Sequence, residues 1–107
     1  HTDLNAFKQL FRRGTARVIT ATARKGAVAM GFMDEEDILS VVNRLGPEHF
    51  YKSMTIHGSH KIWQDVYRYQ DDSNNALYIK LQLSPDSRKA VLIQMKKDEG
   101  KDEQDNA

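Results

Sequence analysis

Cysteine is absent from this chain of 107 residues. Its absence excludes disulfide bonds, thiolate metal sites and a cysteine nucleophile. No apolar run approaches the roughly 18 residues that indicate a membrane span, and no signal-peptide pattern opens the sequence. The chain begins with His1 and not with Met, so the missing pattern says nothing about a segment before it. These absences predict a cytoplasmic protein that does not act in a membrane.

The motifs of common nucleotide-binding and serine-hydrolase sites are missing as well. The sequence has no Walker-type glycine loop, no G-x-G-x-x-G and no G-x-S-x-G. His57 and His60 form an H-x-x-H, but Gly58 and Ser59 place it in a turn, with no third ligand nearby in the sequence. Surface histidines are the simpler interpretation, so we expect no metal and no other cofactor. A metal hydrolase built on this pair is the weakest hypothesis, and it predicts inhibition by a chelator.

Charge is distributed unevenly along the chain. The formal net charge is +1, but from Lys96 onward three Lys stand against five Asp or Glu, a local charge of −2 that leaves +3 on the residues before it. A net charge of +3 on these residues is compatible with binding a polyanion, but it does not indicate which one. We expect a single domain over residues 1–97, followed by an acidic, flexible tail over residues 98–107.

The first half of the chain has helical periodicity. Near its start, apolar residues recur at helical spacing: Leu4, Phe7, Leu10 and Phe11. Thr2 is the expected cap of this helix. The β-branched stretch 15–22 predicts a short strand, whose Thr22 would cap an alanine-rich helix over 23–30 that Gly31 ends. A third helix is expected after Asp34, because acidic residues fill its first turn. Its apolar stripe contains Ile38, Val41, Val42 and Leu45.

After Pro47 the period changes to that of strands. Strands are expected over 50–56, 62–70, 76–83 and 89–97, joined by short turns, which predicts an antiparallel meander. In the last strand, alternation predicts one face with Val91, Ile93 and Met95 and the other with Leu92, Gln94 and Lys96. The fold class is therefore α+β: an antiparallel sheet, made of this meander and one N-terminal strand, packed by the N-terminal helices in two layers.

The uncovered face of the meander is where a site is expected. By alternation this face displays Tyr78, Lys80, Gln82, Gln94 and Lys96. In the strand 62–70, alternation groups Gln64 with Arg68. A solvated polar face is one interpretation, since antiparallel sheets commonly face water on one side. A phenol beside two amines also suits phosphate chemistry, because amines neutralise charge and a phenol can exchange a proton.

One long block of the chain resembles a known family. Residues 50–68 read FYKSMTIHGSHKIWQDVYR. This block is similar to the MqsR family of bacterial toxins, in which F-Y-K-S-M-T precedes a turn and then I-W-Q-D-V-Y-R. The similarity continues through ALYIK at 76–80 and ends at VLIQMK in the last strand, so it covers roughly residues 2–97. It implies a RelE-like fold and a metal-independent endoribonuclease, an mRNA interferase that cuts at GC-containing sites and inhibits translation and growth.

The resemblance also implies which residues act. The F-Y-K block carries over Lys52, the W-Q-D block carries over Gln64, and the strand 76–83 carries over Tyr78. For a terminal lysine, one gap placement selects Lys96 and another selects Lys97, because the preceding turn is longer here than expected; alternation favours Lys96. Alternation groups Lys52 with Phe50 and Met54 instead, which a strand edge or bulge would reconcile. Further RNA contacts are expected from Arg68, Lys80, Lys97 and His60.

The partners implied by the resemblance are mRNA and an MqsA-like antitoxin. Such antitoxins carry a zinc-binding module and a helix-turn-helix module, so DNA would be bound only through the antitoxin. The ribosome is a further candidate partner. The implied reaction is attack of a ribose 2′-hydroxyl on the adjacent phosphate, which requires RNA. The rival hypothesis is a non-catalytic RelE-like module that binds RNA or protein, since a fold does not guarantee a function.

Overall fold

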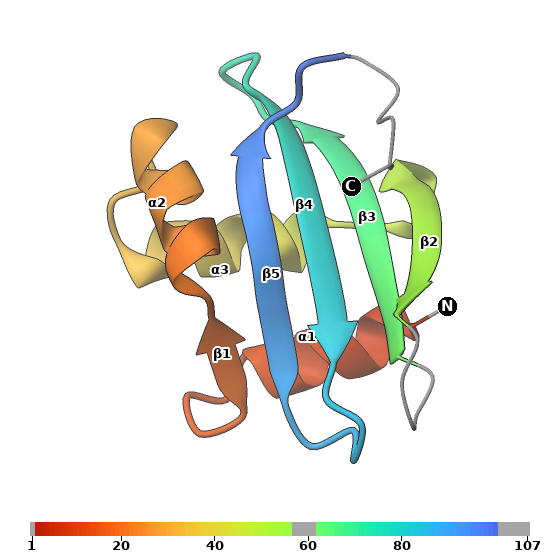
Figure 1. The fold of residues 1–107 in the computed structure, drawn as a ribbon. Helices are drawn as coiled ribbons and strands as arrows, with labels where there is room; N and C mark the ends of the chain where they lie inside the picture. Colours follow the sequence, from red (N-terminus) through yellow and green to blue (C-terminus); the bar gives the residue numbers. More distant parts are fainter. Residues whose placement is uncertain (1, 57–61, 101–107) are drawn as a thin grey trace.

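A mixed sheet forms one layer of the molecule and helices cover one of its faces (Figure 1). The fold is taken from a computed structural model, in which residues 2–56 and 62–100 are described. The strands are β1 (Arg17–Ile19), β2 (Phe50–Ile56), β3 (Ile62–Gln70), β4 (Ala76–Leu83) and β5 (Ala90–Lys97). The order β1-β5-β4-β3-β2 contains the predicted antiparallel meander, and β1 adds to β5 in parallel. The α+β class is therefore confirmed.

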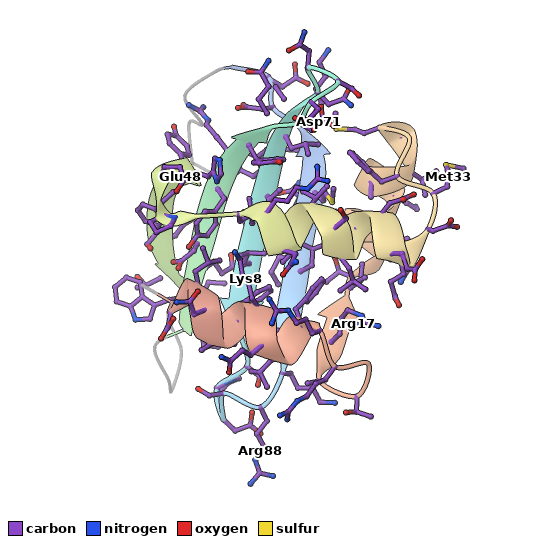
Figure 2. The ribbon with its side chains drawn as sticks, turned by 180° about the vertical axis from the view of Figure 1, so that it is seen from behind. Lys8, Arg17, Met33, Glu48, Asp71 and Arg88 are labelled. Atoms are coloured by element: carbon purple, nitrogen blue, oxygen red, sulfur yellow. The ribbon has the colours of Figure 1, made fainter. Side chains whose placement is uncertain are left out.

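The helices within the described residues are α1 (Leu4–Phe11), α2 (Ala21–Ala29) and α3 (Glu35–Arg44). Figure 2, which views the molecule from behind, shows α1 and α3 lying across the sheet. The core between the layers includes Phe7, Phe11, Ala23, Ala27, Ile38, Val42, Tyr67, Leu77, Ile79, Leu81, Leu92 and Met95. We call the face that contributes to this core the covered face, and the opposite one the open face. None of the helices described is long and apolar enough to cross a bilayer.

Two of the predicted helix caps are wrong. Asp3, not Thr2, caps α1: its carboxylate accepts hydrogen bonds from the backbone N–H groups of Asn5 and Ala6 at 2.9 and 3.2 Å. Thr20, not Thr22, caps α2, with its Oγ accepting from the N–H of Ala23 at 3.0 Å. The predicted strand 15–22 is therefore shortened to Arg17–Ile19. The third prediction is confirmed, because α3 begins directly after Asp34.

Helix α2 lies along the edge of the sheet, beside the end of β5 that extends beyond β1 (Figure 1). Thr20 fastens its start, since the hydroxyl donates to the carbonyl of Ile93 at 2.8 Å. In the middle of the helix, a Cβ on Gly26 would overlap the carbonyl oxygen of Met95. Only glycine lets the two backbones come this close. The helix thus holds β5 from the side in the region that leads to Lys96.

Two register shifts decide which side chains reach the open face. In β2, Phe50 pairs with Tyr67 and Lys52 with Val66, so Tyr51 is an extra residue. In β5, Gln94 pairs with Lys80 and Leu92 with Leu81, so Ile93 is extra. The predicted faces of β5 are therefore partly wrong: Ala90, Leu92 and Met95 lie in the core, while Val91, Gln94 and Lys96 lie on the open face.

Candidate active site

The open face carries three cross-strand rows of side chains. The upper row consists of Arg68, Tyr78 and Lys96. The middle row consists of Lys52, Val66, Lys80 and Gln94. The lower row consists of Met54, Gln64, Gln82 and Val91. The four side chains predicted to be catalytic, together with Arg68 and Lys80, thus share one face of the sheet.

The two candidate terminal lysines lie on opposite faces. Lys96 pairs with Tyr78, and its Nζ lies 4.8 Å from the centroid of the tyrosine ring. Lys97 pairs with Leu77, which is buried in the core. Directly opposed residues in an antiparallel pair have their Cβ atoms roughly 5 Å apart. The geometry therefore places the amine of Lys96 beside the phenol of Tyr78 and excludes Lys97 from that position.

The bulge in β2 leaves Lys52 on the open face with Met54 and separates it from Phe50, so a bulge reconciles Lys52 with alternation in the way the sequence allowed. The extra residue, Tyr51, also turns its ring to this face, where it lies under two cations. The guanidinium carbon of Arg68 is 3.8 Å from its centroid and Nζ of Lys52 is 5.4 Å from it. Cations favour the electron-rich face of an aromatic ring, so Tyr51 holds Arg68 and Lys52 together on the β2–β3 side of the open face. Sequence reasoning missed Tyr51, because its orientation depends on the bulge.

The open face is less open at its centre than alternation predicts. Tyr78 is 2% exposed and Val66 is 0% exposed, although both point away from the helices. Long cationic side chains cover apolar surface with their methylene stems while their charged ends reach water. Tyr78 is flanked by Arg68 and Lys96 in its row, with Lys96 over its ring. The buried ring of Tyr78 thus lies beneath the side chain of Lys96.

Asp98 brings a negative charge to the upper row. Its Oδ2 lies 3.3 Å from Nε of Arg68, and its backbone N–H donates to the carbonyl of Ala76 at 2.8 Å. The backbone pairing of β5 with β4 thus extends one residue past Lys97. The sequence assigned Asp98 to a flexible acidic tail and gave no sign that this residue is ordered against the site. Arg68, expected to bind RNA, holds a carboxylate here.

The lower row contains a direct contact between two amide side chains. Nε2 of Gln64 donates to Oε1 of Gln82 at 2.8 Å, across the neighbouring strands β3 and β4. Both side chains are half-buried. Gln64 was predicted from the resemblance, whereas Gln82 was noted only as a residue of this face. The structure brings the two together.

A separate polar group is buried on the covered face. Asp65 is 1% exposed and accepts hydrogen bonds from Oγ of Ser53 at 2.6 Å and from the N–H of Thr2 at 2.7 Å. On the same strand, burial raises the pKa of Tyr67 to about 12, and the negative charges of Asp65 and Asp3 add to this. These residues face the helices, so they belong to the fold and not to the site.

No metal-binding cluster of three or more His, Asp or Glu side chains occurs among residues 2–56 and 62–100. His57 and His60 lie outside the described residues, so the metal hypothesis and the RNA contact expected of His60 stay predictions. What the described site offers is positive charge from lysines and an arginine, a phenol and two amides. Such groups can bind a phosphodiester and stabilise charge that develops on it.

Two comparisons with known proteins show what this chain is similar to. The family model described as "Motility quorum-sensing regulator, toxin of MqsA" matches residues 1–97. A protein of Escherichia coli (strain K12) named "mRNA interferase toxin MqsR" is 41% identical over 68 residues, which cover 64% of this chain and 67% of that protein. Both matches agree with the resemblance seen in residues 50–68.

Proposed function

The chain belongs to the MqsR family of toxins, and from this premise we propose that it is an mRNA interferase, an endoribonuclease that acts in the cytoplasm. One observation carries the proposal: the residues taken over from the family share the open face, where Lys96 lies opposite Tyr78. Cleavage at GC-containing sites, with inhibition of translation and growth, is expected from the family resemblance. We assign the activity to a domain over residues 1–97, to whose end Asp98 is paired; most of the acidic tail predicted over 98–107 lies outside the described residues.

The proposed reaction is an internal transesterification. The ribose 2′-oxygen forms a bond to phosphorus, the bond from phosphorus to the 5′-oxygen breaks, the 2′-hydroxyl loses its proton and the 5′-oxygen gains one. The products are a 2′,3′-cyclic phosphate and a 5′-hydroxyl. No metal takes part, so alignment and electrostatic stabilisation have to supply most of the rate.

Each group of the site has a part in this reaction. Lys52 and Lys96 neutralise charge on the phosphorane, and Lys96 leaves the ring of Tyr78 to do so. The phenol of Tyr78 then positions the phosphate and exchanges a proton with it. Gln64 holds the substrate by hydrogen bonds. Arg68 and Lys80 bind flanking phosphates, which positions the strand without reading its sequence.

Tyr78→Phe tests the phenol directly. The substitution keeps the buried ring and removes only the hydroxyl, so the fold and the contact with Lys96 should persist. Loss of one such contact in the transition state commonly costs on the order of 100-fold in rate. Unchanged RNA cleavage by Tyr78→Phe, with Lys96→Ala also unchanged, would remove the assignment of the site.

Partners follow from the family. Members of this family are described as toxins of MqsA. We propose that an MqsA-like antitoxin neutralises this chain, that any zinc and any helix-turn-helix belong to that antitoxin, and that DNA is bound only through it. The ribosome is proposed as a further partner that supplies mRNA in an accessible form.

The deciding experiment incubates the purified protein with RNA in EDTA and maps the cut positions and the chemistry of the ends. We expect cleavage to persist in EDTA and to leave 2′,3′-cyclic phosphate and 5′-hydroxyl ends. A matched RNA with one 2′-deoxyribose at the main site should resist cleavage there. RNA binding without any cleavage would instead support the non-catalytic module, and cleavage abolished by EDTA would support a metal hydrolase.

A further inference from the structure

We propose that Gln64 and Gln82 together form a subsite for one nucleobase, which determines which RNA sequences are cut. This inference rests on the proposed function, because it needs RNA on the open face. Gln64 alone is expected from the family. Gln82 enters only through the structure, where its Oε1 accepts a hydrogen bond from Nε2 of Gln64 at 2.8 Å.

The bond between the two amides leaves groups suited to a base edge. A glutamine amide has one carbonyl oxygen and two N–H donors. Gln64 uses a donor in the shared bond and keeps its carbonyl oxygen, whereas Gln82 uses its oxygen and keeps its nitrogen with two protons. The pair therefore offers an acceptor from β3 next to donors from β4. It can complement a base edge on which a donor lies next to an acceptor.

The subsite lies at the right distance from the phosphate-binding groups. Along β2, β3 and β4 the lower row is two residues from the middle row that contains Lys52 and Lys80. At roughly 3.4 Å per residue this separation is about 7 Å. A base attached to a ribose whose phosphate lies on the lysines falls within this reach. The charged rows thus hold the backbone, and the neutral row meets the base.

Apolar side chains flank the amide pair on both sides. Met54 pairs with Gln64 from β2, and Val91 pairs with Gln82 from β5. Both are half-buried and both lie on the open face, in the same row as the amides. Thioether and methyl groups can pack against a base while the amides bind its edge. A row that is polar in the centre and apolar at its ends suits a flat heterocycle better than a phosphate.

Gln82→Met tests the inference, because it keeps the length of the side chain and removes its hydrogen-bonding atoms. The matched control is Gln94→Met, the same change on the same face but in the middle row. Each protein is given an RNA library with randomised positions, and the cut sites are sequenced. We expect the base preference at one position next to the cut to weaken by about 10-fold in Gln82→Met and to persist in the control.

Gln82→Glu gives the second test, since it replaces the amide donors with an acceptor. We expect the preferred base at that same position to change, towards a base that offers donors on the contacted edge. If both Gln82 variants cut the same sequences in the same ratios as the unaltered chain, the inference is wrong. It is equally wrong if Gln82→Met slows every site alike while its thermal unfolding is unchanged.

A binding measurement separates this inference from the proposed function. Single-stranded RNA oligonucleotides that differ at one base are titrated with the unaltered chain, Gln82→Met and Gln94→Met, followed by fluorescence anisotropy. Base discrimination that is lost only in Gln82→Met supports the subsite even if no RNA is cleaved, in which case only the proposed catalysis fails. Equal discrimination in all three proteins overturns the subsite, whatever the cleavage assay gives.

Discussion

The two faces of the sheet are built from the same strands and have opposite characters. On the covered face, Leu77, Ile79 and Leu81 from β4 pack in an apolar core against the helices. On the open face, the alternating residues of that strand, Tyr78 and Lys80, lie among cations, amides and a second tyrosine. Successive residues of the strand thus alternate between the covered face, which stabilises the fold, and the open face, which carries the candidate active site. Substitutions on the covered face should change unfolding, and those on the open face should change RNA cleavage.

The largest effect is expected on the covered face. Phe7 is 0% exposed and stacks on Phe11 with ring centroids 5.3 Å apart. Phe7→Ala should lower the free energy of unfolding by about 3 to 5 kcal/mol, because it opens a cavity in the core. Urea denaturation measures this. Cleavage per folded molecule should stay near that of the unaltered chain; if it falls as steeply as stability does, the two faces are not independent.

Lys96 and Lys97 test the difference between the faces at neighbouring positions. Lys96→Ala should slow RNA cleavage on the order of 100-fold, about 3 kcal/mol in activation free energy, because a charge at the phosphorane is lost. Lys97→Ala, one residue away but paired with Leu77, should cleave at nearly the original rate. Initial rates on one defined RNA measure both. The reverse pattern would assign the reaction to Lys97 and contradict the register described here.

Tyr67, on the covered face, should make the stability of the fold depend on pH. Its pKa is raised to about 12, chiefly by burial, from an ordinary value of 10. As the pH rises, the unfolded chain therefore loses this proton before the folded chain does. Tyr67 does not change the free energy of unfolding below pH 10, and it lowers that free energy by about 2 to 3 kcal/mol as the pH rises from 10 to 12. Tyr67→Phe removes this loss. Denaturation at several pH values should show the two proteins diverging only above pH 10; parallel curves would contradict the prediction.

The smallest effect is expected at Asp98. Its ion pair with Arg68 is partly exposed, and such pairs contribute at most about 1 kcal/mol. Asp98→Asn should remove the negative charge beside Arg68 and tighten RNA binding by roughly 3-fold at low salt, with the gain fading as salt screens the charges. Glu99→Gln is the matched control, because it makes the same change of charge at an exposed neighbour. Equal gains in both variants would show that the change of net charge, and not the loss of the ion pair with Arg68, causes the tighter RNA binding.

The sequence predicted the layers of this fold well, because long amphipathic patterns depend on period alone. The α3 stripe and the four strands of the meander follow from spacing and turn residues. The caps of α1 and α2 were displaced by one and two residues, since Thr2 and Asp3, or Thr20 and Thr22, are similar cap formers and only tertiary contacts choose between them. The bond from Thr20 to the carbonyl of Ile93 is one such contact.

Which residues form the site stays a prediction, but their arrangement on the sheet shows what the sequence could not indicate. Lys52 and Gln64 came from the long block 50–68, Tyr78 from the strand 76–83 and Lys96 from an ambiguous alignment of the last strand; all four lie on the open face. Tyr51, Asp98 and the pairing of Gln64 with Gln82 could not be foreseen. Each depends on a bulge, on backbone pairing beyond Lys97 or on the register between strands, and none of these has a signature in local composition.

The bulge in β5 finally bears on how this strand is compared with others. Val91 and Lys96 point the same way although an odd number of steps separates them, which plain alternation forbids. The extra residue of the bulge, Ile93, accounts for this odd number. A relative with one residue fewer between these positions can present the same lysine with no bulge at all. When β5 is aligned with the strand of such a relative, the gap should therefore be placed within the strand. The length of the turn before the strand then does not affect the alignment of the lysine.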